Sequence, residues 1–405
     1  MAGHALAACL AMLALLAGRG ALAETVVSVT VDMRAEIAAG RFDPARHGVG
    51  MRGALAPLSW QRSLLARPVG DGRYTLELRF ARIPFGGQAA PYKFRIEREG
   101  QGGDEGWEQG PNRLLTFDTA APVIDRAFDA PPQPLAPRRT GRIERLGRVA
   151  SAHVAAREVQ VWLPPGYADG GTRRYPVLYL HDGQNVFDAQ AAGAEWMVDE
   201  TAQRLAEAGE IDPPIIVAVD HGPDRLLDYT PTRAVLGAER LGQGPTRAVG
   251  GGAPAYGRFL FDELKPLIDA RYRTRPEAEA TAVGGSSLGG LVSLWLALQP
   301  ERRIGAALVV SPSLWWDDRW ATREASRERP AAANRPRLWL DIGAHEGDEG
   351  VAELQRLAAA LRAQGWSDAT LASTLDPEGH HDEVSWASRV EAMLRFLYGR
   401  RPPSR

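Results

Sequence analysis

The chain has almost no cysteine and almost no lysine. Cys9 is its single cysteine in 405 residues, and Lys93 and Lys265 are its two lysines. One cysteine cannot form an internal disulfide, and a chain that loses Cys9 with an N-terminal signal has no thiol nucleophile. The formal net charge is −2. This near balance is not typical of proteins that bind nucleic acid or membrane surfaces, so we expect neither partner.

Long apolar runs are also missing, apart from one near the N-terminus. Residues 5–17 form an apolar run of the length found in signal peptides, and 21–23 (ALA) fit the small-residue rule for cleavage before Glu24. The run is too short to span a bilayer, so we expect no membrane insertion. We expect a signal peptide over residues 1–23 and a periplasmic or secreted protein. Lipidation at Cys9 is a minor alternative, because most of the run follows it.

A Pro- and Arg-rich stretch over residues 119–150 divides the rest of the chain. Its composition is typical of a semi-rigid linker. Before it, residues 24–118 contain short alternations of apolar and polar residues between Gly-rich turns, which predict a small β-sandwich.

After the linker, residues 151–400 alternate continuous apolar runs with helical patterns. Runs of this kind are typical of buried parallel strands joined by crossover helices, so this part is expected to be α/β. The expected strands are 176–180, 214–219, 281–283, 306–310 and 337–342, and the expected helices are 256–270, 288–299, 351–363 and 386–397. The Gly- and Arg-rich segment 232–254 has no clear period and is expected to be a mobile loop over a site.

The stretch VGGSSLGG places Ser286 and Ser287 between an apolar strand and an apolar helix. A Gly-x-Ser-x-Gly turn between strand and helix presents its serine at the carboxyl edge of an α/β sheet. Small residues are needed two positions before and after that serine, because strand and helix nearly touch. Ser287 has Gly285 and Gly289 there, whereas Leu288 would crowd a turn centred on Ser286. Ser287 is therefore the expected nucleophile.

A serine nucleophile needs a base and an acid, which follow it in the order serine, acid, histidine in this type of fold. The histidines His380 and His381 lie between the last expected strand and the last helix, so either is a candidate base. The loop after residues 337–342 carries Glu346 and Asp348 as candidate acids.

An oxyanion intermediate needs two backbone donors. One is the amide of Leu288, which follows the nucleophile. The other is expected in the loop HDGQN at 181–185, where Gly183 permits a tight bend that turns the amide of Gln184 inward.

Together these motifs resemble the putative-esterase family of α/β-hydrolases, which includes enterochelin, feruloyl and acetyl-xylan esterases and mycolyltransferases. The motifs are 161–167 (VWLPPGY), 175–187 (YPVLYLHDGQNVF), 228–231 (DYTP), 256–260 (YGRFL), 284–290 (GGSSLGG), 311–316 (SPSLWW) and 381–386 (HDEVSW). The resemblance implies Ser287 as nucleophile and the amides of Gln184 and Leu288 as oxyanion donors. It favours His381 as base, because Trp386 follows at the family spacing, and Glu346 as acid, with Asp348 as the alternative.

The part before the linker resembles a starch-binding module more loosely. The resemblance implies sugar contacts by Trp60, Lys93, Trp107 and Asn112. Both tryptophans could instead belong to the core of the sandwich.

These expectations predict an exported serine carboxylic-ester hydrolase that works through an acyl-enzyme without a cofactor or a metal. The substrate is expected to be a carbohydrate-linked, phenolic or siderophore ester, either a small molecule or a glycan. Acyl transfer to a sugar or lipid acceptor needs the same residues, and a non-catalytic carbohydrate-binding protein is a further alternative. The segments 380–382 (HHD) and 181–182 (HD) suggest metal-dependent hydrolysis as a further possibility. No His-x-x-x-His or comparable spacing of metal ligands on a helix accompanies them.

Overall fold

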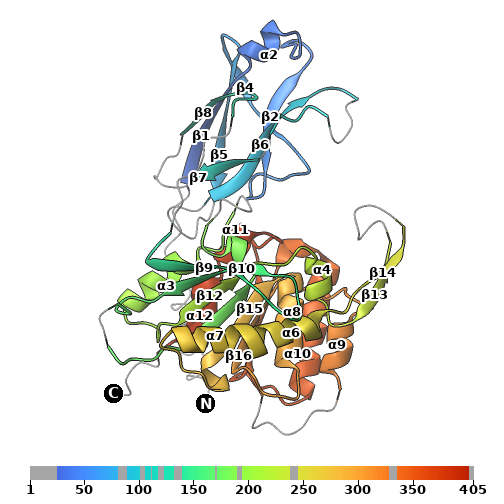
Figure 1. The fold of residues 1–405 in the computed structure, drawn as a ribbon. Coiled ribbons are helices and arrows are strands. Elements are labelled where there is room, and N and C mark those ends of the chain that lie inside the picture. Colours follow the sequence, from blue (N-terminus) through green and yellow to red (C-terminus); the bar gives the residue numbers. More distant parts are fainter. Residues whose placement is uncertain are drawn as a thin grey trace, which may run out of the picture. The chain divides into compact units, whose positions relative to one another are not determined.

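The computed structural model describes residues 25–80, 89–100, 105–110, 112–116, 123–131, 139–168, 171–188, 194–237, 245–327 and 335–400. The chain divides into two compact units, Met1–Gln133 and Pro134–Arg405 (Figure 1). The predicted signal peptide, residues 1–23 including Cys9, lies outside the described residues, and export stays a prediction. No helix in the described ranges is both long and apolar enough to cross a membrane.

The first unit is built from two four-stranded sheets, with the orders β4-β5-β1-β8 and β3-β2-β6-β7. The bounds are β1 Thr25–Asp32, α2 Arg34–Ala38, β2 Gly48–Gly53, β3 Leu64–Leu65, β4 Arg67–Gly70, β5 Arg73–Phe80, β6 Ala89–Glu97, β7 Arg113–Thr116 and β8 Val123–Ala127. Alternate residues of β1 (Val27, Val29 and Val31) are fully buried, as expected for strands with one face against a core. The all-β N-terminal part predicted from this alternation is confirmed.

The segment 119–150, predicted to be a linker, instead contributes a strand to each unit. Its strand β8 pairs in parallel with β1, and β9, Arg142–Val149, pairs antiparallel with β10, Arg157–Leu163. The proline-rich composition did not reveal these strands. Each of them forms by backbone pairing with a strand that lies outside the proline-rich part of the segment, and the composition of the segment gives no sign of that partner. The division between the units falls inside this segment, between residues 133 and 134.

The second unit contains a mixed eight-stranded sheet with the order β18-β17-β16-β15-β11-β12-β10-β9. Strands from β18 to β12 are parallel, and β10 is antiparallel to both neighbours. The remaining bounds are β11 Val177–His181, β12 Ile215–Val219, β15 Thr281–Ser286, β16 Ala306–Val310, β17 Arg337–Gly343 and β18 Leu371–Asp376. The predicted parallel strands are therefore all present.

Helices cover both faces of this sheet (Figure 1). Side chains of β11 alternate between two hydrophobic clusters, with Val177 and Tyr179 in one and Leu178 and Leu180 in the other. The first cluster includes residues of α6 Ala253–Arg258, the π-helical η2 Phe259–Leu264, α7 Lys265–Arg271, α8 Leu288–Ala297, α9 Trp320–Ala325 and α10 Asp348–Ala363. The second includes residues of α3 Val198–Glu207, α11 Glu383–Ala387 and α12 Val390–Tyr398. Burial on both faces explains why the strands read as unbroken apolar runs.

Shorter elements connect these layers. They are η1 Gly183–Asn185, α4 Arg225–Asp228, β13 Arg233–Leu236, β14 Arg247–Gly250, η3 Ala278–Ala280 and η5 Ala344–Glu346. Strands β13 and β14 pair antiparallel with each other. The segment 232–254, predicted to be an irregular loop, therefore contains a two-stranded hairpin in its described part.

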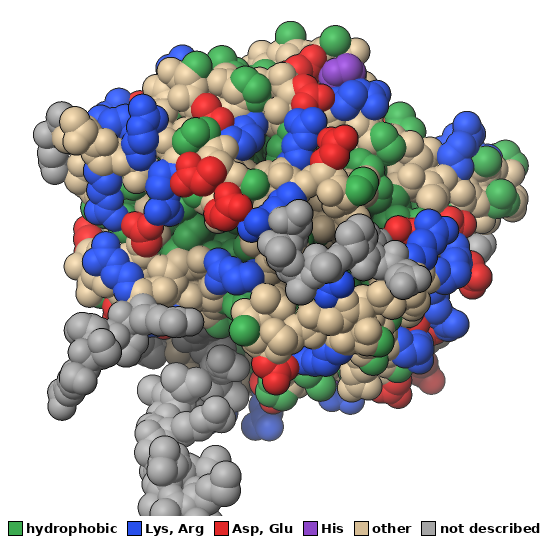
Figure 2. Space-filling model, turned by 90° about the horizontal axis from the view of Figure 1, so that it is seen from below, with side chains coloured by type: hydrophobic (Ala, Val, Ile, Leu, Met, Phe, Trp, Pro, Cys, Tyr) green, Lys and Arg blue, Asp and Glu red, His purple; other side chains and the backbone are tan. Residues whose placement is uncertain are grey.

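Charged side chains of both signs alternate on the face drawn in Figure 2. Ion pairs such as Arg303–Asp262 at 2.6 Å and Arg204–Glu391 at 2.7 Å join many of the arginines to acids. On this face charges of the two signs therefore lie close to one another.

Strand β11 ends in a buried histidine. His181 has 2% of its surface exposed, and its Nδ1 is hydrogen-bonded to the Tyr256 hydroxyl at 2.8 Å. Its Nε2 has no partner among the described residues. Burial lowers the pKa of His181 to about 4, and the positive charges of Arg225 and Arg157 act in the same direction. His181 is therefore neutral in the folded protein at neutral pH.

This histidine should make stability depend on pH. In the unfolded chain His181 takes up a proton below about pH 6.5, whereas the folded protein does not until about pH 4. The contribution of neutral His181 to the free energy of unfolding is fully present above about pH 6.5. About 3 kcal/mol of that free energy is lost as the pH falls toward 4. Chemical denaturation at pH 7 and pH 4.5 should show a smaller pH effect in His181→Gln than in the wild type. The exposed His153→Gln serves as control and should keep the wild-type effect; equal pH effects in all three proteins would contradict the interpretation.

Candidate active site

The residues predicted to act together follow neighbouring strands at the carboxyl edge of the sheet. Ser287 comes directly after β15, and Gln184 comes after the adjacent β11. On the other side, Glu346 follows β17 and His381 follows β18. Ends of parallel strands meet at one edge, where α/β proteins bind their ligands.

Ser287 has the strained backbone conformation expected of a sharp strand-to-helix turn. Its φ is 57° and its ψ is −119°, a combination that residues other than glycine rarely adopt. A Cβ atom at Gly285 would lie 3.1 Å from the backbone of Gly289, and one at Gly290 would lie 2.8 Å from the carbonyl oxygen of Val310. The glycines are needed because strand and helix approach this closely.

The structure brings Glu346, and not Asp348, to His381. Nδ1 of His381 lies 2.7 Å from Oε2 of Glu346. Asp348 is exposed at the start of α10. Oε1 of Glu346 accepts hydrogen bonds from the amide of Gly343 at 2.7 Å and from the hydroxyl of Ser311 at 2.6 Å. Burial alone raises the pKa of Glu346, but the hydrogen bonds from His381, Ser311 and Gly343 outweigh it, so the net pKa is below the ordinary value.

Ser287 and His381 line one cavity of about 510 Å³. No hydrogen bond joins them in the described part of the chain; instead Oγ of Ser287 lies 3.1 Å from Oγ of Ser313. The carbonyl oxygen of Ser287 also accepts the amide of Ser313 at 3.0 Å. Long contacts between a nucleophile and its base are common in proteins without bound substrate. The serine hydroxyl must turn from Ser313 to reach a base in this cavity.

The loop after β11 has the tight bend that the sequence predicts at Gly183. Asp182 has a left-handed φ of 58°, and a Cβ atom at Gly183 would lie 2.6 Å from the backbone carbon of Ala218. The bidentate ion pair of Arg225 with Asp182, at 2.7 and 2.8 Å, holds this bend. Gln184 follows in the one-turn helix η1.

Both predicted oxyanion donors lie at helix starts. Leu288 is the first residue of α8, and Gln184 is in the first turn of η1. Amides at these positions have no acceptor within their own helix. They are therefore available to an anionic oxygen, although Gln184 is not among the residues that line the cavity of Ser287.

The cavity has walls that the sequence did not identify. Arg225, Leu226 and Arg319 line it, together with Ser313, Leu314 and Trp315 of the predicted 311–316 motif. Trp315 is 37% exposed, whereas its neighbour Trp316 is fully buried. Residues 228–231, one of the motifs that carry the family resemblance, do not line this cavity. Tyr229 is instead buried beneath the 181–185 loop, where its hydroxyl accepts the amide of Asp182 at 3.2 Å.

The residues suggested for sugar binding lie in the first unit. The rings of Trp60 and Trp107 are 6.2 Å apart between centroids, and both side chains are half-buried. The guanidinium groups of Arg52 and Arg95 lie 5.2 and 5.5 Å from the Trp107 ring centroid. Nζ of Lys93 donates to the carbonyl oxygen of Gly110 at 2.7 Å. Asn112, the fourth of these residues, is exposed.

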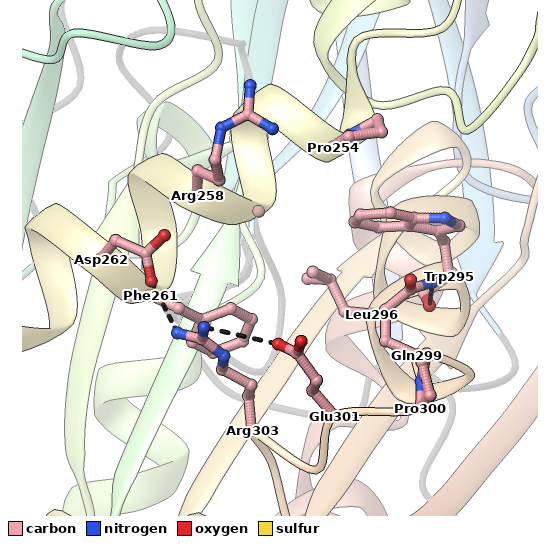
Figure 3. Close-up of a pocket in the computed structure, with 11 residues that line it drawn as sticks. Pro254, Arg258, Phe261, Asp262, Trp295, Leu296, Gln299, Pro300, Glu301 and Arg303 are labelled. Carbon is pink, nitrogen blue, oxygen red and sulfur yellow. Dashed lines mark hydrogen bonds and ion pairs between the residues drawn. The ribbon is translucent and has the colours of Figure 1, made fainter.

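Two further features lie outside this site. Figure 3 shows a pocket of about 320 Å³ lined by Trp295 and Phe261, where Arg303 pairs with Asp262 at 2.6 Å and with Glu301 at 3.5 Å.

The second feature is a group of three carboxylates, Glu195, Asp199 and Glu200, which have oxygen atoms within 4.8 Å of one another. Burial, together with the charge of Glu200, raises the pKa of Asp199 well above the ordinary carboxyl range. A proton on Asp199 lowers the repulsion between these carboxylates.

Comparison with known proteins finds relatives that each match part of the chain. The uncharacterized protein YbbA of Bacillus subtilis is 25% identical over 263 residues, which are 63% of this chain and 97% of that protein. The siderophore enterobactin esterase of Emericella nidulans is 26% identical over 197 residues, 46% of this chain but only 62% of that protein. The endo-1,4-β-xylanase/feruloyl esterase of Xylanibacter ruminicola is 23% identical over 64% of this chain and 31% of its own length.

Solved structures share the fold at low identity. The enterobactin esterase FES from Shigella flexneri, determined in the presence of 2,3-dihydroxy-N-benzoyl-serine, superposes with a TM-score of 0.58 at 16% identity, over 87% of this chain and 88% of that chain. The sequence pattern of the putative esterase family matches residues 152–397, more than half of the chain. The chain therefore belongs to the putative esterase family and is a serine hydrolase with the α/β-hydrolase fold.

Proposed function

We propose that the protein hydrolyses carboxylic esters through an acyl-enzyme on Ser287, with His381 as base and Glu346 as acid. The contact between His381 Nδ1 and Glu346 Oε2, at 2.7 Å in the wall of the cavity that holds Ser287, carries this proposal. When the Nδ1–H of an imidazole donates a hydrogen bond to a carboxylate, Nε2 is free to accept a proton from a serine hydroxyl.

The chain's own groups supply each step. Ser287 Oγ turns from Ser313 toward His381, gives up its proton to Nε2 and attacks the ester carbonyl carbon. The amides of Leu288 and Gln184 stabilise the resulting oxyanion. His381 then returns the proton to the leaving alcohol, and the acyl group stays on Ser287. Water then loses a proton to His381 and attacks the acyl carbon, and His381 passes that proton to Ser287 Oγ as the bond to the acyl group breaks and the acid leaves.

The cavity supports an ester with an aromatic or sugar group. Its exposed Trp315 offers a flat apolar surface, and the same walls hold two arginines, Arg225 and Arg319, and three glutamates, Glu346, Glu349 and Glu353. Arg225 is paired with Asp182 at 2.7 Å, and Arg319 with Glu349 at 3.0 Å and Glu353 at 3.1 Å, so these lining residues carry no excess of positive charge. Relatives are described as siderophore and feruloyl esterases. We therefore include phenolic, catecholate and carbohydrate-linked esters in the proposed substrate class.

Removal of the serine hydroxyl tests the reaction. Ser287→Ala should hydrolyse p-nitrophenyl acetate at the rate of the buffer and should lose covalent labelling by a fluorophosphonate, because no other group takes over the attack. Ser286→Ala is the matched control and should be labelled like the wild type. Labelling that persists in Ser287→Ala would exclude Ser287 as nucleophile.

The two candidate acids can be separated by a second pair of variants. Glu346→Gln should lower kcat by roughly 100-fold or more, because an amide neither stabilises the imidazolium nor fixes the required tautomer. Asp348→Asn, two residues away and exposed, should keep the wild-type kcat. A full kcat in Glu346→Gln, or a loss confined to Asp348→Asn, would reverse the assignment.

We also propose that Trp60 gives the first unit an affinity for polysaccharide. Arg52 and Arg95 already lie against Trp107, so Trp60 offers the ring more open to stacking on a sugar face. Migration in native gels that contain soluble starch measures this affinity. The wild type should be retarded and Trp60→Ala should not, whereas Val69→Ala, at an exposed apolar position of β4, should behave like the wild type. A wild type that starch does not retard would refute this proposal.

A further inference from the structure

Behind Glu346 lies a buried polar cluster that the proposed reaction does not use. Its members come from the ends of β16 and β17 and from the segment around α11 and α12. They are Ser311 (1% exposed), Asp341 (0%), Trp386 (5%) and Arg389 (7%). Taking such groups out of water is costly unless each finds partners. The hydrogen-bond partners of these four residues therefore indicate the role of the cluster.

Ser311 lies at the centre of this cluster. Its Oγ is 2.6 Å from Oε1 of Glu346, 3.0 Å from Nε1 of Trp386 and 3.1 Å from Nη2 of Arg389. Its amide donates to the carbonyl oxygen of Asp341 at 2.9 Å. The φ of Ser311 is 40°, in the left-handed region where a non-glycine residue is strained. The surrounding contacts hold the residue in this conformation.

The chemistry of these partners decides where the hydroxyl proton points. A hydroxyl has one hydrogen to donate and two lone pairs to accept with. The indole of Trp386 and the guanidinium of Arg389 can only donate, so they take up the two lone pairs. The single hydrogen of Ser311 is then left for Glu346, the one acceptor among the three partners.

This direction matters for Glu346. Its Oε1 receives both the Ser311 hydroxyl and the amide of Gly343 at 2.7 Å. With Oε1 fully occupied by donors, Oε2 is the oxygen that remains for Nδ1 of His381, at 2.7 Å. Arg389 is held in turn by Asp341 and Asp376, each at 3.4 Å, and Trp339 donates to Asp341 at 2.6 Å. Arg389, one of the two donors to Ser311, is therefore itself held in position.

We infer that Ser311 is a positioning residue for ester hydrolysis, which directs its only proton to Glu346 and so keeps Oε2 turned toward His381, while Trp386 and Arg389 fix the hydroxyl. The inference rests on the proposed function, because Ser311 acts through Glu346. Ser311 is not among the residues that line the cavity of Ser287.

The test compares Ser311→Gly with the wild type in hydrolysis of p-nitrophenyl acetate. Glycine accepts the positive φ, so the change removes the hydroxyl without adding backbone strain. Loss of one hydrogen bond to a charged group should lower kcat roughly 10- to 100-fold with KM unchanged. The buried Ser293, whose hydroxyl donates to the carbonyl oxygen of Gly289 at 2.7 Å, gives the matched control: Ser293→Ala should keep the wild-type kcat.

A pH profile provides a readout that general loosening of the fold would not move. Without the Ser311 donor the carboxylate of Glu346 holds a proton more tightly, so the acidic limb of kcat/KM should shift to higher pH. The titratable and charged groups near Glu346 and His381 are unchanged in the variant; they are Asp341, His345, Asp376, His380, Asp382, Glu383 and Arg389 and, in the cavity walls, Arg225, Arg319, Glu349 and Glu353. An unshifted limb would count against the inference.

A double-mutant comparison shows whether Ser311 acts through Glu346. In a Glu346→Ala background, adding Ser311→Gly should change kcat by less than about twofold, because the group it positions is gone. The same loss in both backgrounds would mean an independent structural role and would overturn the inference, as would a normal kcat in Ser311→Gly alone.

If Ser311→Gly does not fold, Ser311→Cys takes its place. Its weak S–H donor should give an intermediate loss of kcat, and a normal kcat overturns the inference. An inactive wild type that no fluorophosphonate labels would instead refute the proposed function.

Discussion

The close approach of β15 and α8 is the constraint on which the site depends. Strand and helix meet at Ser287 with so little space that a Cβ atom at Gly285 would lie 3.1 Å from the backbone of Gly289, and one at Gly290 would lie 3.2 Å from the carbonyl oxygen of Gly285. This contact forces the positive φ of Ser287 and points its side chain over the sheet edge. The amide of Leu288 then becomes the first free donor of α8. A looser junction would lose the exposed hydroxyl and the donor together.

The sheet order brings the other groups to this junction. Strands β11 and β16 both pair with β15, and β17 and β18 follow beside β16. The 181–185 loop therefore lies on one side of Ser287, and the segments that carry Ser311, Glu346 and His381 lie on the other. Residues nearly 200 positions apart in the chain thus meet, as the hydrogen bond of Asn185 to Glu383 at 2.9 Å illustrates.

Sequence reasoning recovered the features that depend on local pattern. The elbow at Ser287 could be predicted because its glycines are adjacent in the chain, and the parallel strands because burial on both faces leaves unbroken apolar runs. Features that depend on distant partners were missed. Strands β8 and β9 were hidden in a proline-rich segment, and Ser311 carries no local mark of its contact with Glu346. Trp315 and Trp316 are neighbours with opposite exposure, which only the packing around them decides.

The contacts of the site are divided unequally between its two halves. Glu346 is held by a serine, a backbone amide and a histidine, and behind the serine stand an arginine and an indole that are themselves fixed. Ser287 by contrast contacts its neighbour through one hydroxyl pair at 3.1 Å. Reorienting the partly buried Ser287 hydroxyl breaks a single weak contact, whereas reorienting Glu346 would break several hydrogen bonds. In the proposed reaction Glu346 is therefore preorganised, and the adjustment that starts the reaction falls on Ser287, the group that costs least to move.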